Sequence, residues 1–149
     1  MATDEIERDV VAAWSSIPHV AGINNHMGSK ATADERVVRA VLSVVLANDS
    51  FFLDSRTTSA SVVPEIAEKL GVSYLRNDRF IDPDTDPGRV RDRIIQVAER
   101  AKERGWAVAI GHVHRSTYEG LVAAIPFLEA EGVRLVHLTD VLAKATTSR

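Results

Sequence analysis

The sequence predicts a single α/β domain, and three observations support this prediction. Short apolar runs with the length of buried strands alternate about five times with helical segments, a pattern typical of a parallel sheet or a barrel with helices outside. The length of 149 residues suits one domain with a sizeable core. The hydrophobic share of 45% and the charged share of 26% are ordinary for a globular protein. No repeat or linker divides the chain, so we expect residues 1–149 to form one domain.

Charge and composition exclude several kinds of partner. The formal net charge is -3, and acidic and basic residues are interspersed, so the chain offers no basic face to nucleic acid. The chain has no cysteine, which excludes disulfides and thiolate zinc sites. No apolar run approaches the roughly 20 residues of a membrane span, and the opening residues have no signal-peptide pattern. We therefore expect no nucleic-acid partner and no membrane segment in this chain.

Helices are predicted where apolar residues recur with helical spacing. They cover residues 4–14, 32–47, 61–70, 86–105 and 116–132, followed by a helical turn over 139–144. Ile6, Val10 and Trp14 share one face of the first helix. Gly71 follows the third helix in the usual C-terminal position, and Asp86 with Pro87 gives the fourth helix a cap and a preferred first residue.

Two capping boxes define the starts of the second and fifth helices. Thr32 is followed by Glu35, and Ser116 by Glu119, so each hydroxyl and each carboxylate can satisfy a free backbone amide of the first turn. Pro126 cannot donate a helical hydrogen bond, and we expect it to kink or divide the fifth helix.

Strands are predicted in the short apolar runs between these helices. They cover residues 20–24, 51–53, 72–75, 106–110 and 133–138. The run over 106–110 is almost continuously apolar, as expected for a strand that is buried on both faces. The carboxyl ends of parallel strands meet at one face of such a fold, which is where ligands bind.

Polar residues follow four of these strands and are the candidate site. They are residues 24–29 with His26, residues 54–57 with Asp54, residues 78–82 with Asp78, and residues 111–114 with His112. His112 directly follows an apolar strand and a glycine, a position that favours a functional imidazole. We expect no site role for His19, His114 or His137, the last as a structural histidine within the final strand.

Several of these residues have an alternative structural interpretation. His26 could hydrogen-bond a carbonyl group in a turn, and Asp54 could orient an imidazole, bind a metal, cap the next turn or pair with Arg56. Alternation along a strand places Asp78 and Asp82 on the same side, although Asp82 precedes a proline and could only cap a turn. The chain has no P-loop and no H-x-x-x-H spacing, so the residues alone indicate an α/β domain with a histidine and aspartate site.

Four blocks of this sequence resemble the divergent polysaccharide deacetylases. The blocks are N-N-H-M-G-S at 24–29, F-F-L-D-S-R-T at 51–57, F-I-D at 80–82 and A-I-G-H at 109–112, within a match over about residues 17–142. The resemblance implies a distorted (β/α) barrel and a metal-dependent hydrolase that removes acetyl groups from N-acetylated sugars, such as cell-envelope glycans outside the cytoplasm. The alternative is a non-catalytic module of the same fold that binds a glycan or another partner.

The resemblance also implies roles for seven residues. A divalent metal, expected to be zinc, would bind His26, and His112 would be the general acid that protonates the departing amine. Asp54 would be a second catalytic group that orients the site. The expected substrate-binding residues are Asn25, Ser29, Arg56 and Asp78.

This sequence departs from the family pattern at its N-terminal side. It lacks the earlier strand that ends in an Asp-Asp pair and a second early segment with a histidine, and it has Asn77 where the family usually has arginine. The resemblance therefore predicts a barrel that is incomplete at the N-terminus, corresponding to the C-terminal two-thirds of the family's domain. Missing strands leave sheet edges exposed, so we expect the chain to form homo-oligomers through those edges.

Overall fold

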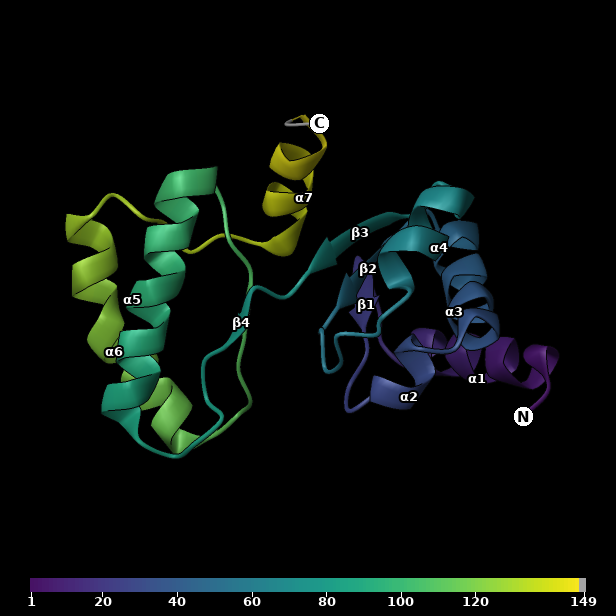
Figure 1. Cartoon of the computed structure of the whole chain (residues 1–149), viewed down its shortest axis with the longest axis horizontal. Coiled ribbons are helices and arrows are strands. Elements are labelled where there is room, and N and C mark those ends of the chain that lie inside the picture. The colour runs from purple at the N-terminus through teal and green to yellow at the C-terminus, as the bar shows by residue number, and fades with distance from the viewer. Residues whose placement is uncertain (148–149) are drawn as a thin grey trace. The chain divides into compact units, whose positions relative to one another are not determined.

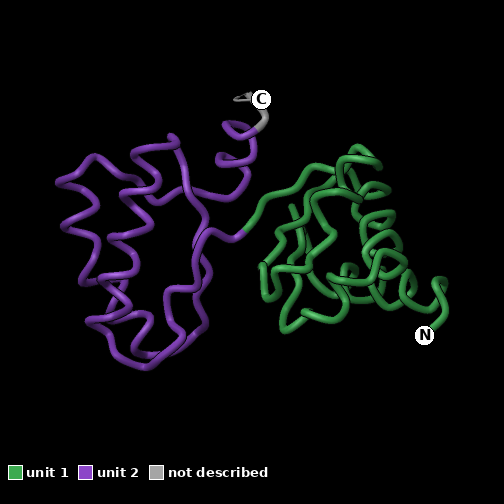
Figure 2. Tube along the Cα trace, in the orientation of Figure 1, with its two compact units in different colours: residues 1–76 green, residues 77–149 purple. Residues whose placement is uncertain are grey.

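The computed structural model describes residues 1–147 and divides the chain into two compact units, unit 1 over residues 1–76 and unit 2 from residue 77 onward (Figure 2). Both units are built from parallel strands and helices (Figure 1). The predicted α/β class with parallel sheets is confirmed. Neither unit is a closed barrel by itself. Within residues 1–147, no helix is both long enough and apolar enough to cross a membrane.

Unit 1 is a three-stranded parallel sheet with helices. Its elements are α1 (Thr3–Ser15), β1 (Gly22–Asn24), α2 (Ser29–Thr32), α3 (Glu35–Ala47), β2 (Phe51–Asp54), α4 (Val63–Leu70) and β3 (Ser73–Arg76). The strand order is β1-β2-β3, with Gly22 opposite Phe51 and Phe51 opposite Ser73. All four residues of the central strand β2 are buried. The core joins α3, α4 and β2 through Leu42, Val45, Phe52, Val63 and Ile66, among others.

Unit 2 pairs two short parallel strands and packs two long helices together. Its elements are β4 (Arg79–Phe80), α5 (Pro87–Arg104), β5 (Ala109–Ile110), α6 (Arg115–Ala130) and α7 (Leu138–Thr147). Arg79 lies opposite Ala109, and Phe80 opposite Ile110. Helices α5 and α6 lie side by side (Figure 1) and enclose a core that includes Val90, Ile94, Ala98, Ala124 and Leu128.

Three of the predicted helix boundaries are confirmed, one by a side-chain cap and two by the backbone conformation of a glycine. The Asp86 carboxylate accepts hydrogen bonds from the amides of Gly88 and Arg89 at 2.8 and 3.2 Å, so Asp86 caps α5. Gly71 and Gly105 end α4 and α5 in the left-handed conformation, which glycine adopts without steric cost.

Both predicted capping boxes are wrong. Asp34, two residues after Thr32, is equally suited to capping, and its carboxylate accepts from the amides of Arg36 and Val37. The Thr32 hydroxyl instead donates to the Gly28 carbonyl group within α2. Helix α6 begins after His114, one residue earlier than predicted, and without a side-chain cap.

Two strand predictions and one helix prediction also need correction. Only Ala109 and Ile110 of the 106–110 run pair as a strand, because the Asp78 carboxylate takes the Val108 amide in place of a neighbouring backbone carbonyl. Residues 133–138 form no strand, and Leu135 and Val136 are exposed. Division of the helix at Pro126 is wrong, because α6 continues through this residue on its exposed face, where water can satisfy the carbonyl group that loses its partner; a kink at Pro126 stays a prediction.

Candidate functional site

The two strands of unit 2 bring Asp82 and His112 together. Phe80 and Ile110 lie opposite each other, and the pairing continues as the Ile81 amide donates to the Ile110 carbonyl at 2.9 Å. Two residues beyond the paired position on each strand, the chain reaches Asp82 and His112. Because the two strands are parallel and Phe80 pairs with Ile110, the carboxylate of Asp82 and the imidazole of His112 lie together at the carboxyl ends of these strands.

The Asp82 carboxylate contacts three groups. Its Oδ2 accepts hydrogen bonds from the backbone amide of His112 and from the Thr117 hydroxyl, the latter at 2.7 Å. Its Oδ1 lies 3.1 Å from Nδ1 of His112. The Asp82 side chain is 1% exposed, whereas that of His112 is 43% exposed. A buried carboxylate therefore supports an imidazole that solvent or a substrate can reach.

Opposing effects set the pKa of Asp82. Burial alone raises the pKa of this carboxyl, but hydrogen bonds from the His112 amide, the Thr117 hydroxyl and the His112 ring together lower the pKa below its ordinary value. Asp82 is therefore ionised near neutral pH and accepts the proton on Nδ1 of His112, which fixes the tautomer of the ring. Nε2 is then the nitrogen through which the ring exchanges a proton, as in histidine general acids and bases.

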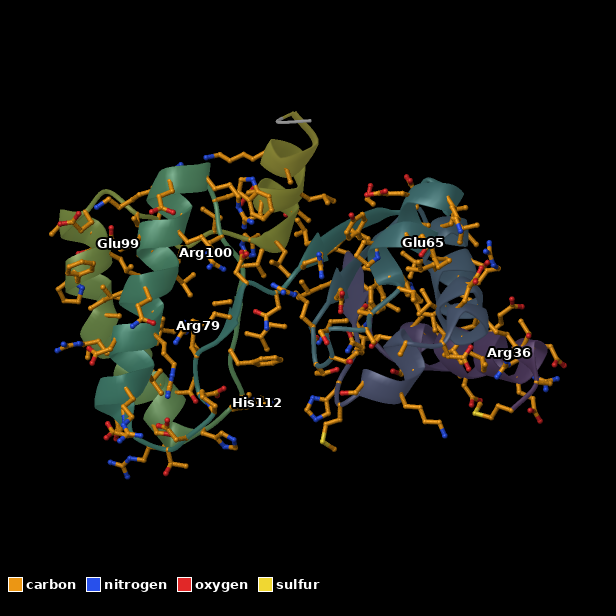
Figure 3. The ribbon with its side chains drawn as sticks, in the orientation of Figure 1. Arg36, Glu65, Arg79, Glu99, Arg100 and His112 are labelled. Carbon is orange, nitrogen blue, oxygen red and sulfur yellow. The ribbon has the colours of Figure 1, made fainter. Side chains whose placement is uncertain are left out.

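Aromatic rings flank His112. The ring of Phe80 is stacked at an interplanar angle of 8° with a centroid distance of 6.4 Å, and the His114 ring lies at 5.9 Å (Figure 3 labels His112). Val113, between the two histidines, is fully exposed. Apolar and aromatic surface beside a polar group is typical of sites that bind sugars or other amphipathic ligands.

The ends of β1 and β2 form a polar rim in unit 1, made by Asn24, Asn25, Ser55 and Thr57. The Asn25 side-chain oxygen accepts from the Ser55 amide at 2.9 Å, and the Asn25 carbonyl group accepts from the Ser55 hydroxyl at 2.6 Å. The Asn24 amide group donates to the same hydroxyl at 3.2 Å. Within residues 1–147, Asn25 Nδ2 and Thr57 Oγ1 are buried atoms that no hydrogen bond satisfies.

Asp54 is fully buried beneath this rim and organises the loop that follows β2. Its Oδ1 accepts from the Arg56 amide at 2.8 Å, and its Oδ2 accepts from the Ser61 hydroxyl at 2.9 Å. Its ion pair is with Arg76, at 3.8 Å, rather than with Arg56. These contacts match the turn-capping alternative, and the catalytic role of Asp54 stays a prediction.

Three other predicted residues lie in or beside the loops that follow β1 and β2. The Ser29 hydroxyl donates to the Thr57 carbonyl at 3.0 Å and so joins the first residue of α2 to the loop after β2. Arg56 and His26 are exposed, and Arg56 has a positive φ of 53°, an uncommon conformation for a residue with a side chain. The metal role of His26 and the substrate roles of Ser29 and Arg56 stay predictions.

Asp78 lies in unit 2, at the opposite end of the β4–β5 pair from His112. Its carboxylate accepts from the Val108 amide at 2.8 Å and pairs with Arg104 at 2.6 Å and Arg100 at 3.7 Å. Arg104 also lies 3.7 Å from the ring centre of Trp106. These contacts join β4 to the end of α5, and the proposed contact of Asp78 with a substrate stays a prediction.

The described residues do not form a metal site. Throughout residues 1–147, no three side chains of the histidine, aspartate or glutamate type lie close enough to hold an ion together. The described residues thus bring together no set of the three or four protein ligands that a stable zinc site uses.

Asp82 lies within the candidate segment 78–82 but has no predicted catalytic role, and Thr117 lies outside every predicted site segment. The position of Asp82 before Pro83 suggests a turn cap, and Thr117 falls within a predicted helix without any signal of its own. The available signal is the equal spacing of Asp82 and His112 from the ends of two short strands, which places them together only if those strands are parallel neighbours in register.

Solved structures define the fold class. A protein of Agrobacterium tumefaciens C58, ATU2773, matches over 91% of this chain and 56% of its own, with a TM-score of 0.79 and 17% identity. The lactam utilization protein of Thermus thermophilus matches over 91% of this chain and 68% of its own, with a TM-score of 0.62 and 19% identity. The chain thus shares an α/β fold with both proteins.

The chain belongs to the divergent polysaccharide deacetylase family, whose model matches residues 1–142. The uncharacterized protein YibQ of Escherichia coli K12 is 32% identical over 78% of this chain. An uncharacterized protein of Haemophilus influenzae Rd is 33% identical over 93% of it. This chain covers 37% and 49% of the lengths of these two relatives, respectively.

Proposed function

We propose that the protein is a deacetylase-like hydrolase that cleaves the acetyl amide of N-acetylated sugars in cell-envelope glycans, and that its two units belong to one deacetylase domain of the barrel type. Family membership supports the reaction class. The observation that carries the proposal is His112, an accessible imidazole held by an ionised, buried carboxylate. Such a group transfers protons between water and a leaving amine near neutral pH.

The proposed chemistry uses this imidazole for one proton. Water adds to the acetyl carbonyl carbon and gives a proton to Nε2 of His112, while Asp82 stabilises the positive charge that forms on the ring. The C–N bond then breaks, and Nε2 returns the proton to the sugar nitrogen. The products are acetate and a free amine. In this proposal Asp54 is a second catalytic group, and Asn25, Ser29, Arg56 and Asp78 contact the sugar.

The direct test is release of acetate from N-acetylglucosamine oligomers and from peptidoglycan fragments. We expect one acetate and one new primary amine per cleavage, measured by an enzymatic acetate assay and by mass spectrometry. A protein that releases acetate from neither substrate contradicts the hydrolase proposal.

The unit 1 rim favours a second candidate, a module that binds glycans without cleaving them. Asn25 Nδ2 and Thr57 Oγ1 are buried polar atoms of this rim without a hydrogen-bond partner among the described residues, and ordered water or a bound group is the usual partner of such atoms. Calorimetry with the same oligomers separates the two candidates. Saturable binding without acetate release, weakened by Asn25→Ala, supports the binding module.

Metal dependence is general in the deacetylase family, and zinc bound through His26 is a further part of the proposal. Stable zinc sites use three or four protein ligands, which the described residues do not bring together. We therefore expect the isolated chain to retain well below one equivalent of zinc after gel filtration in metal-free buffer, and His26→Ala to lower that content. Stoichiometric zinc that is unchanged in His26→Ala contradicts this role.

We also propose that the chain self-associates through the edge of the unit 1 sheet. Strand β1 is an edge strand, and beside it lies an open cavity of about 600 Å³ lined mainly by apolar side chains, including Trp14, Ile23, Val41 and Phe52. Unprotected strand edges beside apolar surface favour pairing with another chain. We expect concentration-dependent dimers in sedimentation velocity, reduced by Ala21→Lys at the exposed residue just before β1. A monomer at every concentration contradicts the proposal.

A further inference from the structure

Thr117 connects the first turn of α6 to the acid–base pair of unit 2. It is the third residue of that helix, its side chain is buried, and its hydroxyl donates to Oδ2 of Asp82 at 2.7 Å. A threonine this early in a helix commonly serves the helix's own backbone. In this structure the hydroxyl is directed to a carboxylate that is distant in sequence.

The two carboxylate oxygens of Asp82 contact different groups. Oδ2 receives the Thr117 hydroxyl and the His112 amide, and Oδ1 faces Nδ1 of His112. Rotation of the carboxylate about its last bond would disturb all three contacts. Two donors on Oδ2 therefore hold Oδ1 toward the imidazole.

Packing restricts the Thr117 side chain to this orientation. A Cβ added at Gly111 would lie 3.0 Å from the methyl group of Thr117 and equally close to the side chain of Ile81, so these two side chains together occupy the space that the glycine leaves open. A β-branched side chain has few χ1 choices, and fixing the methyl group also fixes the hydroxyl. Gly111, directly before His112, thus provides the space that directs the Thr117 hydroxyl toward Asp82.

We propose that Thr117 is a positioning residue for catalysis, which holds the Asp82 carboxylate so that its Oδ1 orients the imidazole of His112. The inference depends on the proposed function for its catalytic consequence. Its structural part is independent of turnover, because it concerns the contacts of Asp82 alone. Thr117 acts through Asp82 and has no direct role in the chemistry.

The test compares two substitutions that separate the hydroxyl from the methyl group. Thr117→Val keeps the shape and removes the hydroxyl, and Thr117→Ser keeps the hydroxyl and removes the methyl group. Carbon-13 NMR of the Asp82 carboxyl reads its pKa directly during a pH titration. We expect the pKa of Asp82 to rise in Thr117→Val, because a hydrogen bond to the ionised form is lost, and to stay nearer to wild type in Thr117→Ser.

Two further variants keep the test decisive. Ser116→Ala removes the neighbouring hydroxyl of the same turn and should leave the Asp82 titration unchanged. Gly111→Ala keeps the Thr117 hydroxyl but adds a Cβ against its methyl group, so it should raise the pKa of Asp82 as Thr117→Val does. If Thr117→Val does not fold, Gly111→Ala still tests the proposal. An Asp82 pKa that stays at its wild-type value in folded Thr117→Val or folded Gly111→Ala overturns the proposal.

Activity distinguishes failure of this inference from failure of the proposed function. With deacetylase activity present, we expect kcat to fall roughly tenfold in Thr117→Val with KM little changed, and Thr117→Ser to recover most of it. A raised Asp82 pKa in a protein without deacetylase activity would support the carboxylate positioning and reject the proposed function. A fall in kcat with no change in the Asp82 titration would overturn the positioning role.

Discussion

Replacing His112 by asparagine is expected to lower kcat for acetate release by about 10²–10⁴-fold, the usual contribution of a general acid–base group. Asparagine keeps a polar side chain of similar length but cannot carry a proton between water and the leaving nitrogen. Substrate binding through other residues should persist, so KM should change much less than kcat. Acetate release at several substrate concentrations measures both quantities.

His114→Asn is the matched control for this prediction. The His114 ring lies near that of His112, but the Asp82 carboxylate contacts the His112 ring alone of the two. We expect the control to retain nearly full turnover. An equal loss of turnover in both variants would mean that the two histidines act together as a surface. It would contradict a specific acid–base role for His112.

Asp82→Ala is expected to have the largest effect on stability. The substitution leaves the buried Thr117 hydroxyl and the His112 amide without their acceptor, and each unsatisfied group costs about 1–3 kcal/mol. We expect a loss of about 3 kcal/mol in the free energy of unfolding, measured from urea denaturation. Asp84→Ala, which removes an ion pair with Arg93 at the edge of the same loop, should cost about 1 kcal/mol or less.

The same carboxylate predicts a dependence of stability on pH. The folded-state pKa of Asp82 lies below its ordinary value near 3.9, so ionised Asp82 stabilises the fold above that value. This contribution is lost as the pH falls below about 3.9 and through the folded pKa. In Asp82→Asn the free energy of unfolding should therefore fall less steeply as the pH is lowered below about 3.9. A fall as steep as in the wild-type protein would show that ionised Asp82 does not contribute to this pH dependence.

The sequence predicted most helices and the parallel class of the sheets because these depend on local periodicity. It failed at Thr32, because Asp34 is an equally good cap two residues later and the choice depends on packing that no local pattern shows. It failed at 133–138 because apolar alternation can predict a strand but not the neighbour with which the strand must pair.

The candidate site was only partly accessible from the sequence for a related reason. His112 follows a strand and a glycine, a local signal, and the structure places it on an accessible edge. The partner of His112 depends on the register between two strands about 30 residues apart, which local patterns do not fix. The sequence therefore named Asp54 as a candidate for orienting an imidazole, whereas the carboxylate that holds His112 is Asp82.

The strand order of unit 1 has a consequence for how the chain folds as it is synthesised. Each strand pairs only with the strand that precedes or follows it in the sequence, so β2 can dock on β1 before β3 has left the ribosome. The sheet can therefore grow one strand at a time from β1, and each new strand is joined to the growing edge by helical segments that the chain has just made.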